Sequence, residues 1–160
     1  MGMRIRKYTS ADLSELKSIT AEAFAGVSVD WLIERQFGVL GTDWVARKTA
    51  HIDADVATNA DGVLVAVDDS GAVTGYVTCH LDTATRLGRI ANLAVRADCR
   101  GHGLGRSLIR AALDYFRENG MTHAKIETLA NNAVGAHLYS DMGFQEMGRQ
   151  IHYAMALPRP

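Results

Sequence analysis

The run Arg100-Gly101-His102-Gly103-Leu104-Gly105 constrains the fold of this chain most, because it separates an extended pattern from a helical one. Before it, residues 89–95 are mostly apolar and predict a strand. After it, residues 104–119 place apolar side chains on one helical stripe, and Gly120 follows as a stop. Glycine adopts positive φ at no steric cost, so this run can turn a strand into a helix and aim several backbone N–H groups at one point.

Such a loop suits a phosphate. The first N–H groups of a helix have no partner within it, and the helix dipole adds positive charge there, so a pyrophosphate fits this end. Arg100 and Arg106 add guanidinium groups and Ser107 adds a hydroxyl. A Walker loop is excluded because its lysine position holds Arg106, and a dinucleotide fingerprint because its third glycine would fall on Leu104 or Arg106. A tight turn that binds nothing is the alternative.

Composition limits the class of protein. The chain has 160 residues, of which 48% are apolar, and this favours a single domain over residues 1–160. A net charge of −1 gives no field to recruit nucleic acid or an anionic membrane. No apolar run is long enough for a membrane span or a signal peptide, and Cys79 and Cys99 are too few for a disulfide scaffold, so we expect a cytoplasmic protein. No spacing of ligating residues predicts a metal site.

The order of predicted elements indicates an α+β fold with helices on a mixed, mostly antiparallel sheet, rather than a regular βαβ array. We expect about seven strands and four helical segments. The predicted strands are residues 3–8, 62–68, 72–82, 89–95, 124–129, 144–149 and 151–157, and the predicted helical segments are residues 11–25, 28–60, 104–119 and 133–142. Gly38 and Gly41 are expected to interrupt the segment 28–60.

A second motif presents Tyr139 on a short helix that ends at Gly143-Phe144. With the glycine loop, it resembles the GNAT superfamily of N-acetyltransferases. The positions that match the two sequence blocks of that superfamily are Arg100, Gly103, Gly105, Asn132, Leu138, Tyr139, Gly143 and Phe144. The resemblance extends over essentially the whole chain, although the first sixty residues match only in arrangement. Gly135 departs from the pattern, since many relatives carry alanine there.

The resemblance implies a GNAT-type acyl-CoA N-acyltransferase fold, with acetyl-CoA bound between splayed strands at residues 89–96 and 124–130. A bulge near Leu93-Ala94 would free the Val95 N–H to bond the thioester carbonyl. Asn132 would contact the pantetheine arm, and Tyr139 would protonate the leaving thiolate as general acid. The implied acetyl-CoA contacts are Leu93, Val95, Arg100, Gly101, His102, Gly103, Leu104, Gly105, Arg106, Ser107 and Asn132. Each has a structural alternative: Tyr139 can pack in the core, and Asn132 can cap the helix that follows it.

Glu127 is the first candidate for the base that removes a proton from the attacking amine. The segment Ile126-Glu127-Thr128 is similar to the Leu-Glu-Val segment of the ribosomal-protein N-terminal acetyltransferases, where the matching glutamate is the base. A solvent-facing strand glutamate is the alternative. Another candidate set is the polar stripe on the strand 72–82, in which His80 or Asp82 would act through a water molecule.

The resemblance implies direct attack of a primary amine on acetyl-CoA within a ternary complex. The acceptor would be a small-molecule amine or a peptide N-terminus, held by residues 24–60 and by the final strands, including Gln150, His152 and Tyr153. Acidic side chains that would attract a cationic amine are Asp30, Glu34, Asp53 and Asp55. A non-catalytic acyl-CoA sensor and an enzyme that uses a longer acyl-CoA are the alternatives. The habits of the superfamily also allow a homodimer.

Overall fold

A computed structural model describes residues 2–159. Its centre is a five-stranded sheet with the strand order β1-β2-β3-β4-β5. Neighbouring strands are antiparallel, except that β4 and β5 are parallel. The strands are β1 (Arg4–Lys7), β2 (Val63–Val67), β3 (Val73–Asp82), β4 (Leu87–Val95) and β5 (His123–Ile126). The helices are α1 (Leu13–Ala23), α2 (Val29–Phe37), α3 (Trp44–Asn59), α4 (Leu104–Glu118) and α5 (Ala133–Asp141), with short 3-10 turns η1 (Ser10–Asp12), η2 (Ala60–Gly62) and η3 (Ala97–Cys99).

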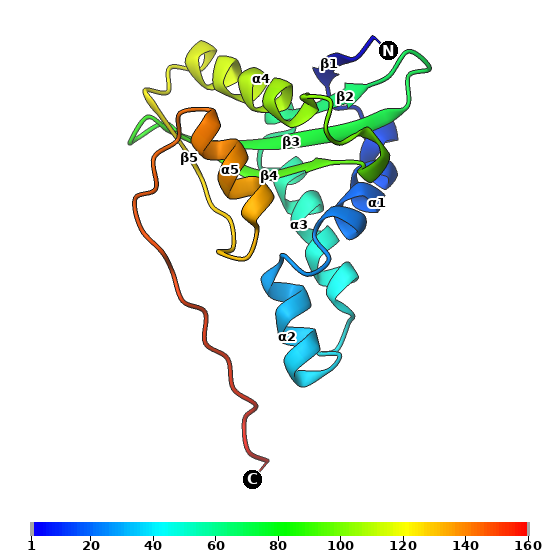
Figure 1. The fold of residues 1–160 in the computed structure, drawn as a ribbon, viewed down its shortest axis with the longest axis vertical. Coiled ribbons are helices and arrows are strands. Elements are labelled where there is room, and N and C mark those ends of the chain that lie inside the picture. Colours follow the sequence, from blue (N-terminus) through cyan, green and yellow to red (C-terminus); the bar gives the residue numbers. More distant parts are fainter. Residues whose placement is uncertain (1, 160) are drawn as a thin grey trace.

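Helices cover both faces of the sheet, with α4 on one side and α1 and α3 on the other (Figure 1). Strand β2 shows why, because all five of its residues are buried. Its side chains alternate in direction. Leu64 and Ala66 join the cluster under α4, whereas Val63, Val65 and Val67 join the cluster under α1 and α3. A continuous apolar run is what a strand buried on both faces requires.

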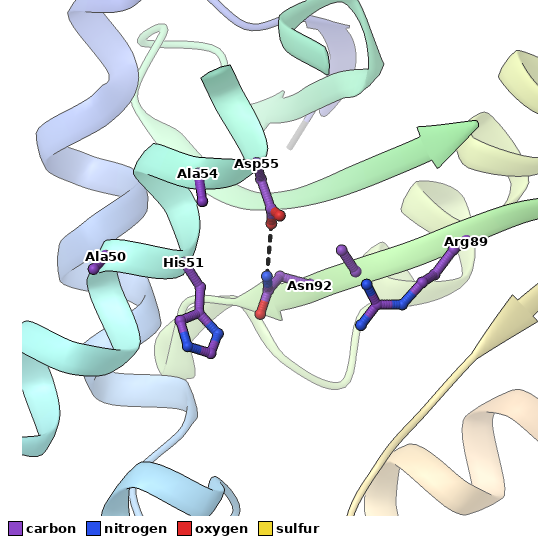
Figure 2. A pocket seen from close by; sticks show the side chains of 7 residues that line it. Ala50, His51, Ala54, Asp55, Arg89 and Asn92 are labelled. Atoms are coloured by element: carbon purple, nitrogen blue, oxygen red, sulfur yellow. Dashed lines mark hydrogen bonds between the residues drawn. The ribbon is translucent and has the colours of Figure 1, made fainter. Parts of the chain in front are cut away.

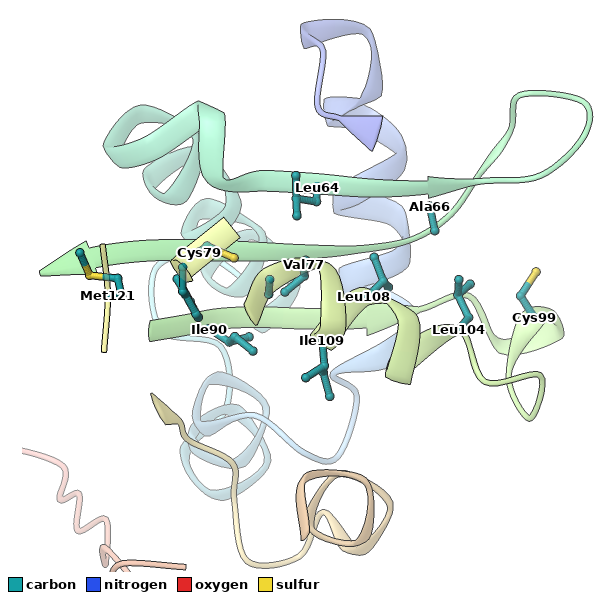
Figure 3. Close-up of a cluster of buried hydrophobic side chains, with 12 residues drawn as sticks. Leu64, Ala66, Val77, Cys79, Ile90, Cys99, Leu104, Leu108, Ile109 and Met121 are labelled. Carbon is teal, nitrogen blue, oxygen red and sulfur yellow. The ribbon is translucent and has the colours of Figure 1, made fainter. Parts of the chain in front are cut away.

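The predicted stripe of α4 is confirmed. Leu108, Ile109, Ala112 and Phe116 are buried against the sheet, and Figure 3 shows part of this cluster between α4 and the strands. The helix ends where Gly120 takes a φ of 78°. The element after the glycine loop is therefore fixed in place by its apolar face.

The prediction of four helices is wrong, because the segment 28–60 divides into α2 and α3. Gly38 and Gly41 take φ values of 82° and 73°, so the predicted interruption is confirmed. Each new helix has its own cap: the Ser28 hydroxyl accepts the Trp31 N–H at 3.3 Å, and the Asp43 carboxylate accepts the Ala46 N–H at 2.7 Å. Along residues 2–159, no helix is long and apolar enough to cross a membrane.

The prediction of seven strands is also wrong, because residues 144–149 and 151–157 form no strand. After Phe144 the chain runs away from the sheet in an extended path (Figure 1). A strand needs a neighbour to pair with its backbone groups, and nothing in the described part of the chain pairs with these residues. The alternation of side chains typical of a strand is present, but within residues 2–159 these residues form no hydrogen-bonded pairing with another strand.

Candidate functional site

The glycine loop joins β4 to α4 as predicted. Gly101 and Gly103 take φ values of 82° and 79°, where any other residue would be strained, and Gly103 caps α4. In the first backbone hydrogen bond of the helix, the Ser107 N–H donates to the Gly103 carbonyl at 3.1 Å. Within residues 2–159, the N–H groups of residues 101–105 have no acceptor. The loop therefore presents a group of free donors at the positive end of a 15-residue helix.

The side chains around this loop divide between two roles. The Arg100 side chain donates from Nε to the Val95 carbonyl at 3.0 Å and lies beside the loop. Arg106 instead forms an ion pair with Asp141 of α5 at 2.5 Å, which holds the pKa of that carboxyl below its usual range. The Ser107 hydroxyl lies 3.4 Å from the Gly103 carbonyl, one turn back in its own helix. Arg106 thus ties α4 to α5, and Arg100 is the guanidinium better placed for an anion.

Strands β4 and β5 separate beside the loop. Their parallel pairing runs from Leu87 and His123 to Ile90 and Ile126 and stops there, while β4 continues to Val95 along β3 alone. Past this point the Arg96 N–H bonds the Thr74 carbonyl of β3 at 2.9 Å. Since N–H directions alternate along a strand, the backbone groups of Val95 point to the open side, where Arg100 reaches its carbonyl. The predicted separation of β4 and β5 is present, and the role of the Val95 N–H as a donor stays a prediction.

The predicted position of the bulge is wrong. Thr78 pairs with Asn92 and Cys79 pairs with Ile90, so Ala91 is the extra residue, and the bulge precedes Leu93-Ala94. The extra residue reverses the side-chain alternation. Ile90 packs on the α4 side, whereas Asn92 faces α3.

Helix α5 brings Tyr139 to the same side of the sheet as α4. The Tyr139 ring is half-buried and meets Phe144 edge-on at 6.3 Å between centroids. Burial raises the pKa of the Tyr139 hydroxyl, which makes no hydrogen bond to any other described residue. The Tyr139 ring packs against the core, as the structural alternative predicts, and its hydroxyl is protonated at neutral pH.

Asn132 is the cap of α5. Its Oδ1 accepts the Gly135 N–H at 3.1 Å, and its Nδ2 donates to the Thr128 hydroxyl at 2.9 Å. A Cβ on Gly135 would stand 2.6 Å from the Asn132 Nδ2, so the departure from the family pattern gives the capping amide its space. The capping alternative for Asn132 is confirmed, and a contact with pantetheine stays a prediction.

Glu127 follows β5 and is held by two cations. Its carboxylate lies 3.0 Å from the Arg89 Nη2 of β4 and 3.0 Å from the Lys125 Nζ. Partial burial raises the pKa of Glu127, but the hydrogen bonds from Lys125 and Arg89 outweigh it and hold the pKa below the usual glutamate range. The side chain is 56% exposed and ionised at neutral pH. It therefore reaches water but is a weaker base than a free glutamate.

Two polar residues of β3, Thr78 and His80, face α3. Asp55 accepts from the Thr78 hydroxyl at 2.6 Å and from the Asn92 Nδ2 at 2.7 Å. The His80 Nε2 lies 2.9 Å from the other Asp55 oxygen without hydrogen-bond geometry. Asp82, at the end of the stripe, is exposed and accepts backbone N–H groups in the next turn. Only part of the predicted stripe therefore faces a shared site.

Lys48 completes this buried polar cluster, and sequence reasoning missed it. Its Nζ donates to the Asn92 Oδ1 at 2.8 Å and lies 4.0 Å from the Phe24 ring centroid. Burial lowers the pKa of Lys48, and this effect outweighs the nearby carboxylates of Asp30 and Asp55, which raise it. The signal was its spacing, because Lys48, Ile52 and Asp55 follow the helical period that marks the inner face of α3.

A pocket of about 220 Å³ lies between α3 and β4 (Figure 2). Arg89 lines this pocket and also donates a hydrogen bond to the Glu127 carboxylate. It therefore connects the pocket to the place where β4 and β5 separate. The residues that line the pocket are Ala50, His51, Ala54, Asp55, Arg89, Ala91 and Asn92. The pocket belongs to the predicted acceptor region, on the side of β4 opposite α4.

The acidic residues predicted to attract an amine are mostly engaged elsewhere. Asp30 and Glu34 lie 3.5 Å from the Arg47 guanidinium, and Asp53 lies 2.7 Å from the Lys17 Nζ. Asp55 is buried in the polar cluster. No free acidic cluster follows from these four positions.

Comparisons with known proteins agree with this geometry. Over 162 aligned residues the chain is 29% identical to the mycothiol acetyltransferase of Tsukamurella paurometabola, covering 96% of this chain and 52% of that protein. The chain spans about half the length of the mycothiol acetyltransferases it matches.

Solved structures show the same fold. The PaiA N-acetyltransferase of Thermoplasma acidophilum, in complex with coenzyme A, superposes with a TM-score of 0.73 at 19% identity and covers 91% of each chain. The ribosomal-protein-S18-alanine N-acetyltransferase of Escherichia coli gives a TM-score of 0.67 at 18% identity, over 92% of this chain and 80% of that chain. Residues 27–144 match the acetyltransferase (GNAT) family, and because this match contains both the glycine loop and the Tyr139 helix, the chain belongs to that family.

Proposed function

We propose that this chain is an N-acyltransferase that moves an acetyl group from acetyl-CoA to a primary amine. One observation carries the proposal: the free N–H groups of residues 101–105 and the open side of Val95 lie along one path beside the splay of β4 and β5. An anion-binding loop at one end of that path and an oxyanion donor along it are what an acyl-CoA thioester requires.

The loop would hold the pyrophosphate, with Arg100 released from the Val95 carbonyl to pair with it. The Val95 N–H would bond the thioester oxygen as negative charge develops there. Tyr139 would donate its proton to the departing thiolate, so that the C–S bond breaks to a neutral thiol. Because the pKa of Tyr139 is raised, the hydroxyl stays protonated until that step.

The amine loses its proton to Glu127, directly or through a water molecule, before or as it attacks the carbonyl carbon. Glu127 lies where β4 and β5 separate and forms an ion pair with Arg89. Arg89 also lines the pocket between α3 and β4. We therefore place the acceptor in this pocket, with a small-molecule amine or a peptide N-terminus as its chemical class. The similarity to a small-molecule acetyltransferase and to a ribosomal-protein acetyltransferase supports both kinds of acceptor equally.

The test is thiol release from acetyl-CoA over a panel of small amines and short peptides, with binding followed by calorimetry. We expect amine-dependent release, and Tyr139→Phe is expected to lower kcat while acetyl-CoA still binds. Tyr8→Phe is the matched control, because Tyr8 packs against the α1 cluster, away from the splay. Binding without turnover on any amine would favour the acyl-CoA sensor, and faster release from a longer acyl-CoA would change the donor.

A further inference from the structure

Asp55 brings a buried carboxylate to the pocket between α3 and β4, and one of its oxygens lacks a donor. The side chain is 7% exposed and lines the pocket (Figure 2). Its Oδ2 accepts from the Thr78 hydroxyl and the Asn92 amide. Within residues 2–159, its Oδ1 accepts no hydrogen bond, although the His80 Nε2 lies 2.9 Å away. A carboxylate oxygen only accepts, so the missing partner of Oδ1 is a donor.

Asp55 also lacks the kind of charge partner that its neighbours on α3 have. Asp53, two residues earlier, lies 2.7 Å from the Lys17 Nζ. In the described part of the chain no lysine or arginine forms an ion pair with Asp55, and the Lys48 ammonium reaches it only through the Asn92 amide. Burying a carboxylate without a paired cation is costly. A cationic group in the pocket would supply both the missing donor and the missing charge.

The walls of the pocket suit a short hydrocarbon chain. Three alanines line it, Ala50 and Ala54 from α3 and Ala91 from the bulge of β4. Its volume of about 220 Å³ is smaller than the roughly 300–1,000 Å³ of pockets that hold drug-sized ligands. The pocket therefore fits a small aliphatic molecule whose cationic end contacts Asp55.

The Arg89 guanidinium in the same pocket already has an anionic partner. Its Nε and Nη2 both donate to the Glu127 Oε2, at 3.1 and 3.0 Å. An anionic group on the acceptor would have to compete with this carboxylate. A cationic group meets no such competition at the Asp55 Oδ1, so the pocket favours a cation over an anion.

We propose that the acceptor is a small aliphatic diamine. Its reacting amino group lies beside Glu127, and its second ammonium group donates to the Asp55 Oδ1. The proposal rests on the N-acyltransferase function proposed above and adds the chemical class of the acceptor. Asp55 determines specificity and takes no part in the chemical step, because the proton of the reacting amine goes to Glu127.

The first test compares three probes that share a four-carbon chain: 1,4-diaminobutane, butylamine and 4-aminobutyrate. Their binding to the full chain is measured by calorimetric titration without acetyl-CoA, so that turnover is not needed. The contact between the second ammonium and Asp55 predicts that 1,4-diaminobutane binds at least about tenfold more tightly than butylamine. Equal affinity of these two probes overturns the proposal. Tighter binding of 4-aminobutyrate would make Arg89 the group that selects the acceptor, and it overturns the proposal as well.

The second test repeats the titrations on variants. Asp55→Asn removes the charge, while its amide oxygen can still accept the two hydrogen bonds that Oδ2 accepts now, and we expect it to abolish the preference for 1,4-diaminobutane. Asp53→Asn is the matched control on the same helix and is expected to keep that preference, because Asp53 pairs with Lys17. Ala54→Leu fills the pocket from an exposed position and should weaken diamine binding, whereas Ala57→Leu adds the same side chain outside the pocket. An Asp55→Asn or Ala54→Leu protein that binds the diamine like wild type overturns the proposal.

Thiol release from acetyl-CoA separates a failure of this proposal from a failure of the proposed function. Release with 1,4-diaminobutane at a lower KM than with butylamine supports the diamine acceptor, and release at equal KM overturns it while the acyltransferase stands. Selective binding of the diamine without release on any amine would contradict the proposed function and support the Asp55 contact. If Asp55→Asn abolishes release with butylamine as well, Asp55 acts on the reacting amine, and the assignment of its role is overturned.

Discussion

The ion pair between Arg6 and Asp12 gives a prediction that can be worked through in numbers. Asp12 is buried, and both of its oxygens accept from the Arg6 guanidinium at 2.8 Å. It also accepts the Thr9 N–H at 2.8 Å. The Arg6 hydrogen bonds, helped by those from Thr9, outweigh desolvation and lower the pKa of Asp12 from 3.8 to about 2. This pair fastens β1 to the start of α1.

The direction of the pH effect follows from this depressed pKa. Above about pH 5 the carboxylate is ionised in both the folded and the unfolded chain, and the full stabilisation is present. As the pH falls toward 2, the unfolded chain binds the proton first, so the stabilisation is lost. At 1.36 kcal/mol per pKa unit, this interaction contributes about 2.5 kcal/mol to the free energy of unfolding at neutral pH.

The assay is urea unfolding of wild type and Asp12→Asn between pH 2 and pH 7. We expect Asp12→Asn to lose about 2–3 kcal/mol at pH 7 and the difference to shrink toward zero near pH 2. Asp114→Asn is the control, because its pair with Arg117 is about two-thirds exposed and should change the free energy of unfolding by less than about 1 kcal/mol. A difference between wild type and Asp12→Asn that does not change with pH would refute this reasoning.

Three further substitutions test other parts of the molecule. Gly103→Ala forces alanine to a φ of 79°, so calorimetry should show weaker acetyl-CoA binding, and the free energy of unfolding should fall by about 1–2 kcal/mol; Gly148→Ala should change neither. Tyr76→Phe removes a buried hydroxyl that lies 2.6 Å from a threonine of α1, and urea unfolding should show a loss of about 1–2 kcal/mol. Arg89→Met removes one of the cations that lower the pKa of Glu127, so the acid limb of the rate profile should move to higher pH if this carboxylate is the base.

Local patterns in the sequence were enough to predict the elements around the site. The strand before the glycine loop, the stripe of α4 and the cap at Asn132 depend on residues within a few positions of each other, and all three are present. The positive φ values of Gly101 and Gly103 are likewise local requirements. The part of the site that we propose to bind the pyrophosphate is therefore predictable from one stretch of sequence.

The buried polar cluster between α3 and β4 was not predictable in the same way. Asn92 of β4 lies 44 residues after Lys48 and 37 after Asp55 of α3, and it meets them only when α3 packs on β4. The extra residue at Ala91 depends on how β4 registers against β3, and that register turns Asn92 toward α3. Pairing between distant segments decides both features, and a periodic pattern carries no information about it.

The C-terminal segment shows a different limit. The alternation in residues 151–157 is a strand pattern and predicts a strand there. A pattern states which face of a strand is apolar, but it does not name the strand that pairs with it. In this chain the pairing partner is missing among residues 2–159, so the pattern stays unpaired.

The most direct test of the central claim compares the binding of coenzyme A and pantetheine, which lacks the pyrophosphate, by calorimetric titration of the wild-type chain. If the free N–H groups of residues 101–105 hold the pyrophosphate, coenzyme A binds at least about tenfold more tightly, which is about 1.4 kcal/mol. Gly103→Ala should remove most of that difference. Equal affinity for the two compounds, or no binding of either, would contradict the assignment of the glycine loop.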